Sequence, residues 1–251
     1  MAFSPEERQR YARHLDLPGF GGRAQEKLRA GRVLVVGCGG LGSPALYYLA
    51  AAGVGRLGLI DSDQVDISNL QRQILHGTAD IGRPKTDSAV ARLRTLNPHV
   101  SLTPHTERLC EANAHDLFAP YDIILDASDN YPTKYLINDS CIVMKKPFVH
   151  AGISAFGGQL LTVVPGQSAC LRCIVPTPPP EAPATHGPLG PVPGVIGSLQ
   201  AIEAIKFLTG VGTLLRDTLL TYDALASAFT PVPAHRNPAC PACGTGTHPQ
   251  D

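Results

Sequence analysis

The stretch RVLVVGCGGLGSPALYYLAAAG, residues 32–53, constrains the fold of this chain more than any other feature. Its β-branched run at 33–36 is typical of a buried parallel strand. Three glycines follow at G-x-G-x-x-G spacing, namely Gly37, Gly39 and Gly42. Ser43, Pro44 and the alanine-rich residues after them predict that a helix begins directly behind the turn. This order predicts a nucleotide-binding turn, and a turn used only for helix–strand packing is the alternative.

The segments after this turn alternate between the two kinds of structure. We expect a helical arm over 4–30 with a turn at 19–22, strands at 56–63, 100–105 and 121–130, and helices at 85–98 and 131–146. Asp61 ends the second strand about twenty residues past the turn, where a carboxylate can bind ribose hydroxyls. The alternation predicts an α/β fold with a Rossmann-like, doubly wound, mostly parallel sheet.

The second half of the chain predicts an antiparallel extension of that sheet. Two extended segments, 147–154 and 157–166, follow one another, and the second begins with two glycines. Residues 176–194 hold eight prolines and should form no regular element, which is typical of a lid or binding loop. A helix at 195–210, a last strand at 219–225 and a coiled tail complete the prediction. We interpret 1–251 as a single domain with an arm at 1–30, a nucleotide-binding half at 31–150 and a partner-binding half at 151–251.

Composition excludes several classes of function. Lys and Arg number 21, and Asp and Glu also number 21, so no net charge attracts nucleic acid or membrane. The N-terminus has no apolar segment of a signal peptide, and no later run has the roughly 18 to 20 apolar residues of a membrane span. A cytoplasmic protein is the expectation. In a reducing compartment the seven cysteines are unsuited to disulfides.

Four of these cysteines form two C-x-x-C pairs, Cys170/Cys173 and Cys240/Cys243. Four thiolates suit tetrahedral Zn²⁺ and leave no open position for water, so we expect a structural zinc site. A redox pair is the alternative. The other three, Cys38, Cys110 and Cys141, lie in core-like or helical contexts and are assigned no chemistry.

Further motifs make the pattern specific. GCGGLGSP, SNLQRQ, GRPK, DASDN, CLRC and CPAC occur in this order between residues 37 and 243. Together they resemble the MoeB and ThiF family, bacterial relatives of ubiquitin-activating enzymes that adenylate the C-terminal glycine of small sulfur carriers. The resemblance runs from about Arg10 to Gly244. It implies that ATP, rather than a dinucleotide, occupies the glycine turn.

The resemblance also implies roles for individual residues. Asp61 matches the acid that binds ribose, Arg72 and Lys85 match the pair that contacts phosphate, and Asp129 matches the acid that holds Mg²⁺. Joining two anions requires such cations, each worth about 3 to 4 kcal/mol in the transition state. The expected nucleotide contacts are Gly39, Gly40, Asp61, Ser68, Asn69, Leu70, Gln71, Arg72, Gln73, Lys85, Asp129 and Asn130.

The expected partners follow from the same resemblance. Arg13 matches an arginine that enters the neighbouring subunit's ATP site, which implies a homodimer with catalysis shared between Arg13, Arg72, Lys85 and Asp129. The substrate is expected to be a ubiquitin-like carrier ending in Gly-Gly, of the MoaD or ThiS type. No rhodanese-like extension follows, so we expect sulfur to arrive from a separate donor protein.

One position departs from the family pattern. Many relatives carry a cysteine in the crossover loop, but Pro183 stands near that position here, and no cysteine occurs between Cys173 and Cys240. Capture of the activated carboxylate as a thioester needs a thiol. We therefore expect the product to be released or passed on as the acyl adenylate. Thr185 and His186 of the loop are possible substitutes for the thiol, although a loop histidine is more often simply solvated.

Other functions stay open at this point. A small-molecule or tRNA-modifying dehydratase of the same superfamily would also activate a carboxylate with ATP. An NAD-dependent oxidoreductase would explain the glycine turn but not Arg72, Lys85 or the cysteine pairs. A carrier-binding scaffold without activity would keep the fold. The sequence does not distinguish molybdopterin from thiamine synthesis as the pathway.

Overall fold

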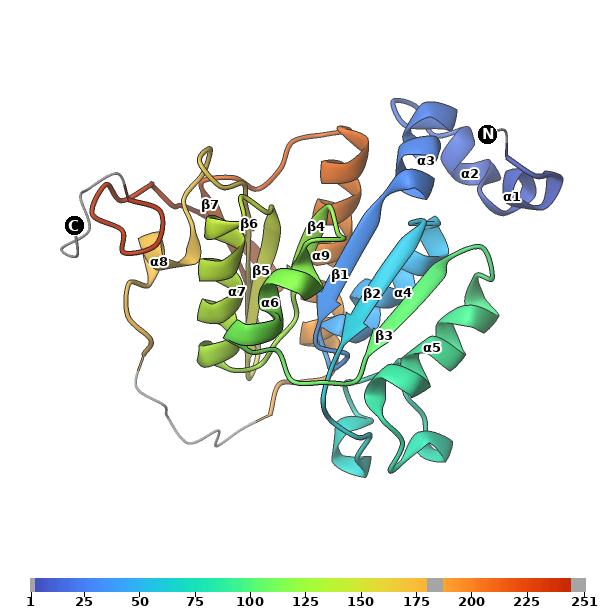
Figure 1. Cartoon of the computed structure of the whole chain (residues 1–251), viewed down its shortest axis with the longest axis horizontal. Coiled ribbons are helices and arrows are strands. Elements are labelled where there is room, and N and C mark those ends of the chain that lie inside the picture. Colours follow the sequence, from blue (N-terminus) through green and yellow to red (C-terminus); the bar gives the residue numbers. More distant parts are fainter. Residues whose placement is uncertain (1–2, 180–186, 245–251) are drawn as a thin grey trace.

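Eight strands form one continuous sheet in the order β3-β2-β1-β4-β5-β6-β7-β8 in this computed structural model, which describes residues 3–179 and 187–244 (Figure 1). The strands are β1 (Arg32–Val36), β2 (Arg56–Ile60), β3 (Ser101–His105), β4 (Ile123–Asp126), β5 (Phe148–Ser154), β6 (Gly157–Val163), β7 (Thr218–Asp223) and β8 (Ala228–Pro233). The helices are α1 (Pro5–Arg10), α2 (Ala12–Leu15), α3 (Gly21–Ala30), α4 (Gly42–Ala52), α5 (Lys85–Leu96), α6 (Glu111–Phe118), α7 (Tyr131–Val143), α8 (Leu171–Ile174) and α9 (Pro191–Thr209), with 3₁₀ turns η1 (Ile67–Asn69) and η2 (Thr78–Asp80).

The pairing between neighbouring strands changes once along the sheet, from parallel to antiparallel. Strands β1 to β5 are parallel, whereas β6, β7 and β8 pair antiparallel. This confirms the predicted doubly wound, mostly parallel sheet with an antiparallel extension. Because β1 lies between β2 and β4, the chain reverses its winding there, and the carboxyl ends of these three strands meet at the edge where such folds bind ligands.

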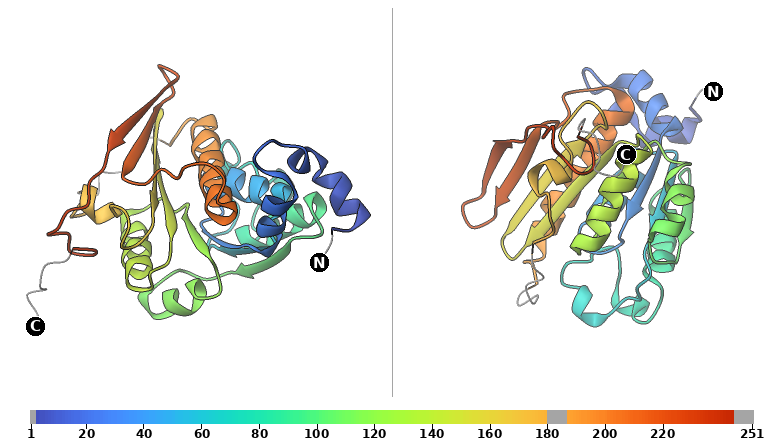
Figure 2. Two further views of the ribbon diagram at one scale, coloured as in Figure 1. Left: turned by 90° about the horizontal axis from the view of Figure 1, so that it is seen from above. Right: turned by 60° about the vertical axis from the view of Figure 1, so that its left-hand side comes forward.

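Helices cover both faces of the sheet, and the strands alternate their side chains between two cores. Val33 and Val35 of β1 join one core together with residues of α4, α5 and α9. Leu34 and Val36 point the other way, into a core shared with α6 and α7. Strand residues buried on both sides explain why the sequence shows continuous apolar runs instead of alternation. Figure 2 shows these two layers, with the β7–β8 hairpin extending beyond the helices.

The helix α9 begins earlier than the sequence predicts. We expected no regular element through residue 194, but the helix starts at Pro191, with Gly190 as its N-cap. Proline is compatible with a first turn because the amide hydrogens there have no partner within the helix. The proline-rich loop expected over 176–194 is therefore described at 176–179 and 187–190, and Pro183, Thr185 and His186 lie outside the described residues.

The helix α6 and the strand β8 are among the elements that the sequence did not predict. The helix α6 connects β3 to β4, as a crossover between parallel strands requires. Its eight residues are too few for a clear amphipathic pattern. The tail was expected to be coil, but 228–233 forms β8 at the sheet's edge. Pro231 and Pro233 obscure this strand in the sequence, and prolines are tolerated in an edge strand.

The N-terminal helices lie at the edge where the parallel strands begin (Figure 1). Tyr11 packs against Gly53, which shortly precedes β2, and the side-chain amide of Asn97 donates a 2.9 Å hydrogen bond to the Tyr11 hydroxyl. The predicted helical arm is confirmed as α1, α2 and α3. None of the helices within the described ranges is both long and apolar enough to cross a membrane.

Candidate functional site: a glycine turn, an acid and two cations at the carboxyl edge of the sheet

The glycine turn has a backbone path that only glycine fits. Gly37 has a φ of +103°, and a Cβ there would lie 2.6 Å from the carbonyl oxygen of Ala127. A Cβ on Gly42 would lie 1.9 Å from the carbonyl oxygen of Gly37. The turn leads straight into α4, so its amide groups and the positive end of a helix dipole lie at the same place. Such a turn can approach phosphate closely.

Asp61 lies directly beside this turn. One carboxylate oxygen accepts a hydrogen bond from the Cys38 amide at 2.8 Å, and the other accepts from the Asp63 amide at 2.8 Å. Burial raises the pKa of Asp61, and these hydrogen bonds and the charge of Lys85 oppose that rise. Each oxygen keeps a second lone pair, so the carboxylate can still accept from a hydroxyl.

The segment 64–84 folds over the turn and supplies Arg72 and Gln73. The Arg72 guanidinium donates to the Ser68 carbonyl at 3.0 Å, and its Cγ lies 3.6 Å from the position of a Cβ on Gly40. Gln73 is buried against Gly39, and its Oε1 has no hydrogen-bond partner among the described residues. A buried acceptor without a partner is costly. The free acceptor of Gln73 therefore fits a site that receives a ligand.

Other residues of this segment have structural contacts of their own. The Ser68 hydroxyl donates to Asp66 at 2.6 Å, and Asn69 Oδ1 accepts from the Asp66 amide at 3.2 Å. Gln71 reaches across to the Pro188 carbonyl at 3.4 Å. Ser68 and Asn69 thus shape η1, while Gln71 holds the chain that precedes α9. Leu70 is half-buried within the same turn.

Lys85 opens α5 and forms an ion pair with Asp63 at 2.8 Å. The Lys85 side chain is only 7% exposed, whereas the Asp63 side chain is 65% exposed. The cation is therefore held in place near Asp61, while its partner carboxylate faces solvent.

Sequence reasoning missed His76, which fastens the segment to the turn. Its Nε2 lies 2.9 Å from the Cys38 carbonyl oxygen, and its Nδ1 lies 2.9 Å from the Ser88 hydroxyl. Burial lowers the pKa of His76, which favours the neutral ring. A neutral ring has one N–H, which the Cys38 carbonyl must receive, so Nδ1 accepts from Ser88. Nothing in the sequence distinguishes this histidine from an exposed one.

Asp129 lies on the loop between β4 and α7, beyond the same edge of the sheet. Its carboxylate is exposed and accepts a 3.2 Å hydrogen bond from the side chain of Asn130. The Asn130 side chain also caps α7 by accepting from the Thr133 amide at 2.9 Å. Mg²⁺ is commonly held by one or two carboxylates together with substrate phosphates, so an exposed Asp129 fits that use.

Below this loop is a buried polar cluster that the sequence prediction did not include. The Asp126 carboxylate lies 2.8 Å from His150 Nδ1 and 3.3 Å from Lys134 Nζ, and it accepts from the Ser128 hydroxyl at 2.6 Å. Burial would raise the pKa of Asp126, but the charge of Lys134 and the hydrogen bonds lower it to about 2. Asp126 is therefore ionised inside the protein.

The structure does not bring Arg13 to this site. It lies exposed on α2, and α2 packs on α3 at the opposite edge of the sheet (Figure 1). The other predicted nucleotide-binding residues, from Gly39 to Asn130, lie at or near the carboxyl edge of the sheet.

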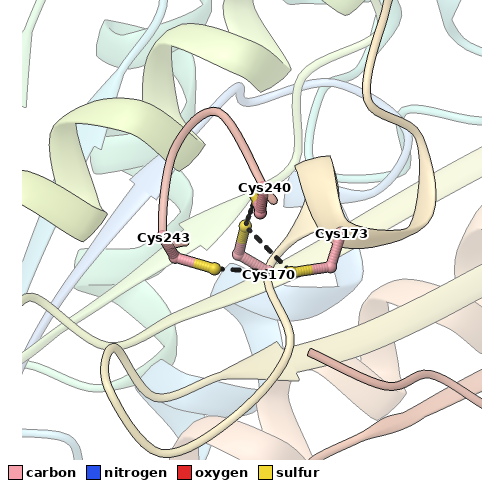
Figure 3. A group of neighbouring side chains, drawn as sticks. All are labelled: Cys170, Cys173, Cys240 and Cys243. Atoms are coloured by element: carbon pink, nitrogen blue, oxygen red, sulfur yellow. Dashed lines mark hydrogen bonds between the residues drawn. The ribbon is translucent and has the colours of Figure 1, made fainter. Parts of the chain in front are cut away.

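The four paired cysteines converge on one point (Figure 3). Their sulfur atoms all lie within 4.8 Å of one another, with contacts of 3.3 Å, 3.6 Å and 3.8 Å. A zinc–sulfur bond of about 2.3 Å places tetrahedral ligands about 3.8 Å apart, so the donor set fits one metal ion. Burial raises the pKa of Cys170 and of Cys243, so a cation beside these two sulfur atoms would favour their thiolate forms.

Cys170 caps the four-residue helix α8, and Cys173 lies within it. Cys240 and Cys243 follow β8, so a shared metal would tie the end of the chain to the start of the second half. Among the described residues this is the only group of three or more possible metal-ligating side chains. Of the remaining cysteines, Cys38 and Cys141 are buried as expected, but Cys110 is exposed at the N-cap of α6.

Comparisons with known proteins identify relatives along almost the whole chain. The model of the ThiF family matches residues 11–242. The chain is 45% identical to the sulfur carrier protein adenylyltransferase of Thermus thermophilus, covering 97% of this chain and 93% of that protein. It is 47% identical to the SAMP-activating enzyme E1 of Haloferax volcanii, over 94% of this chain and 89% of that enzyme.

Two further comparisons concern longer proteins. The adenylyltransferase and sulfurtransferase MOCS3 of Sus scrofa is 47% identical, and the chain spans 54% of its length. The crystal structure of E. coli MccB with ATP has a TM-score of 0.81 and 26% identity, covering 94% of this chain and 74% of MccB.

Proposed function

This chain belongs to the ThiF family, and we propose that it is an ATP-dependent adenylyltransferase that activates the C-terminal glycine of a small ubiquitin-like sulfur carrier. The carrying observation is that the glycine turn, Asp61, Arg72 and Lys85 lie together at the edge where the sheet reverses its winding. In the reaction, a carboxylate oxygen forms a bond to the α-phosphorus of ATP. The bond from that phosphorus to the bridging oxygen breaks, and pyrophosphate leaves with the electron pair.

The turn and Asp61 bind the nucleotide in this proposal. Amide groups around Gly39 and Gly40 and the N-terminus of α4 donate to phosphate. Asp61 accepts from the ribose hydroxyls with the lone pairs that Cys38 and Asp63 leave free. The Oε1 of Gln73, which has no hydrogen-bond partner in the described part of the chain, accepts from a donor on the nucleotide.

Arg72 and Lys85 stabilise the charge that the reaction concentrates. The carrier carboxylate is already ionised, so the chain supplies no nucleophile or base, and catalysis consists of positioning and electrostatics. Lys85 suits this role because its amine is held by Asp63 at 2.8 Å and stays protected from bulk water. Arg72 is half-buried, and its guanidinium donates to the Ser68 carbonyl, a neutral acceptor that competes weakly with phosphate.

We assign Mg²⁺ to the exposed carboxylate of Asp129. When bound, Mg²⁺ neutralises phosphate charge and favours departure of pyrophosphate. The side chain of Asn130 orients that carboxylate by its 3.2 Å hydrogen bond.

A homodimer completes the site in this account. Arg13 is remote from the glycine turn of its own chain, since α2 lies at the opposite edge of the sheet (Figure 1). An arginine on a partner subunit's α2 is free to contribute a third cation, as the family resemblance implies.

The product is proposed to be the acyl adenylate itself. No cysteine occurs between Cys173 and Cys240, so no thiol of the crossover loop is available for a thioester. A separate sulfur-donating protein would then act on the adenylate. The four clustered cysteines are proposed to hold a structural Zn²⁺, because four sulfur ligands leave no position for water.

Carrier-dependent exchange of radiolabel between pyrophosphate and ATP tests the function. Carriers of the molybdopterin and thiamine pathways should be assayed in parallel, each with a matched control that lacks the last glycine. We expect exchange with one intact carrier and none with its control. Binding of NAD without ATP would instead support an oxidoreductase, and carrier binding without exchange would support a scaffold.

A further inference from the structure

Lys134 is a buried cation with every donor in use. It lies on the first turn of α7 and is 7% exposed. Its ammonium group donates to the carbonyl oxygens of Ser128 at 2.7 Å and of Ala151 at 2.6 Å, and it faces the Asp126 carboxylate at 3.3 Å. An ammonium group has three N–H donors, and these three partners account for all of them.

A buried charge of this kind needs a reason, because an apolar side chain of similar volume is often as good or better for stability. The charge of Lys134 is matched by Asp126, which also accepts from His150 Nδ1 at 2.8 Å. An ionised Asp126 can only accept, so Nδ1 of His150 carries a proton. Burial lowers the pKa of His150, which favours the neutral ring. The cluster is therefore neutral overall and fully paired around Asp126.

The most informative contact is the one to Ser128. The carbonyl that Lys134 holds belongs to the peptide group that joins Ser128 to Asp129. Fixing this carbonyl fixes the plane of that peptide group, and with it the position of the Asp129 Cα from which the side chain leaves the loop. The same ammonium group donates to the carbonyl of Ala151 on β5. The loop is therefore held in place relative to the sheet as well as to α7.

Within the described part of the chain, no other side chain forms a hydrogen bond with this peptide group. Asn130 contacts Asp129 through its side chain and caps α7, but it lies on the solvent side. Below the loop, the Ser128 hydroxyl and amide bind Asp126, which Lys134 also holds.

We propose that Lys134 is a positioning residue that orients Asp129 through the Ser128 carbonyl and thereby sets the affinity of the site for its divalent cation. The inference deepens the proposed function and rests on it. Lys134 touches neither nucleotide nor metal in this account. Its effect reaches the site through one backbone carbonyl.

The test uses Mn²⁺ as the probe, with free Mn²⁺ measured by electron paramagnetic resonance in the presence of a non-hydrolysable ATP analogue. Lys134→Met removes the donor while keeping the length of the side chain. We expect it to weaken Mn²⁺ binding about 10-fold to 100-fold, the range for residues that orient metal ligands. Binding of the analogue in EDTA should stay close to that of the wild type.

Two further variants separate positioning from loss of folding. Lys134→Met leaves Asp126 charged and unpaired, so the double variant D126N/K134M is the safer one to fold, and it should weaken Mn²⁺ binding to the same extent. Lys134→Arg keeps a buried cation with several donors and should recover most of the affinity. Near-ultraviolet circular dichroism reports whether each variant is folded.

The matched control is Lys146→Met. Lys146 also donates to backbone carbonyls, those of Ala119 and Tyr121, but at the edge where the strands begin. It should leave Mn²⁺ binding unchanged. Wild-type affinity in folded D126N/K134M, or an equal loss in K146M, would overturn the inference. A wild-type protein that binds neither the analogue nor Mn²⁺ would instead contradict the proposed function.

Discussion

At the scale of single residues, Lys85 combines two environments that rarely coincide. Its amine is almost fully buried, yet its counter-charge, Asp63, is mostly exposed. The exposed carboxylate can turn toward water while the amine stays in place. A phosphate group can therefore share the cation at a smaller cost than if both partners were buried.

This arrangement predicts a clear difference between two variants that break the same ion pair. Lys85→Met should lower the carrier-dependent exchange rate by about 10²-fold to 10³-fold, because it removes one preorganised charge. Asp63→Asn is the matched control and should retain most of the rate, because the cation remains. Steady-state pyrophosphate exchange measures both. An equal fall in the exchange rate of the two variants would mean that the reaction depends on the ion pair between Lys85 and Asp63, and not on the charge of Lys85 alone.

Residues differ in how well the sequence predicts them. Gly37 and Asp61 belong to a local motif whose chemistry is visible in its spacing, and the role of Lys85 was predicted from the resemblance of its GRPK motif to the family. His76 and Lys134 are not visible in this way, because their importance comes from partners far along the chain, such as Cys38 and Ala151. Whether a histidine or lysine is buried depends on the packing of distant elements, which spacing alone does not report. The roles of the predicted nucleotide-binding residues stay predictions.

At the scale of elements, the short stretch 187–190 before α9, here called the strap, packs closely against the segment 64–84 of the candidate site. The Leu189 amide donates to the Ala155 carbonyl at 3.0 Å, and a Cβ on Gly190 would lie 2.2 Å from the Gln71 carbonyl oxygen. At Gly187, on the same strap, no atom of the described residues lies within 4 Å of such a Cβ.

These two glycines allow a matched comparison. Gly190→Ala should lower the free energy of unfolding by about 1 to 3 kcal/mol, because backbone must move to accept the methyl group. Gly187→Ala should have almost no effect. Urea denaturation of both variants checks the difference. A stable G190A would show that the strap does not need its contact with Gln71.

The tail after β8 depends on the cysteine cluster in this account. We expect one zinc ion per chain by elemental analysis, and loss of that ion in the double variant C240S/C243S. The unfolding temperature should fall in the same variant, since a structural metal contributes folding free energy. Cys110→Ser is the control, because Cys110 is exposed and outside the cluster. Metal-free wild-type protein with unchanged stability would contradict the assignment.

The elements also show where sequence patterns fail. The long, strongly patterned elements, such as β1, α4 and α5, are those that the sequence predicts well. The predicted start of α9 was wrong because proline usually ends a helix, whereas here it lies in the first helical turn, where it is tolerated. The strand β8 was missed because edge strands tolerate prolines that central strands exclude.

At the scale of the whole molecule, the position of α2 separates Arg13 from the site of its own chain. The parallel strands begin at the edge of the sheet where α2 lies, and β1 runs from that edge to the glycine turn. The length of a strand therefore separates α2 from the turn (Figure 1). The proposed arginine contribution must then come from a second copy.

A complementation experiment tests this sharing. Arg13→Ala and Lys85→Met should each be nearly inactive alone. When the two are mixed and allowed to exchange subunits, the hybrid has one site with Lys85 intact and Arg13 supplied by the partner. We expect exchange activity to return on mixing. Mixtures that stay inactive while forming hybrids would contradict sharing between subunits.

The most direct measurement of the central claim is the intact mass of the carrier protein. After incubation with this chain, Mg²⁺, ATP and a pyrophosphatase, the carrier should gain one adenylyl group at its C-terminal glycine, and hydroxylamine should convert it to the hydroxamate. The enzyme itself should carry no covalent carrier. An unmodified carrier in the presence of folded, ATP-binding protein would contradict the account.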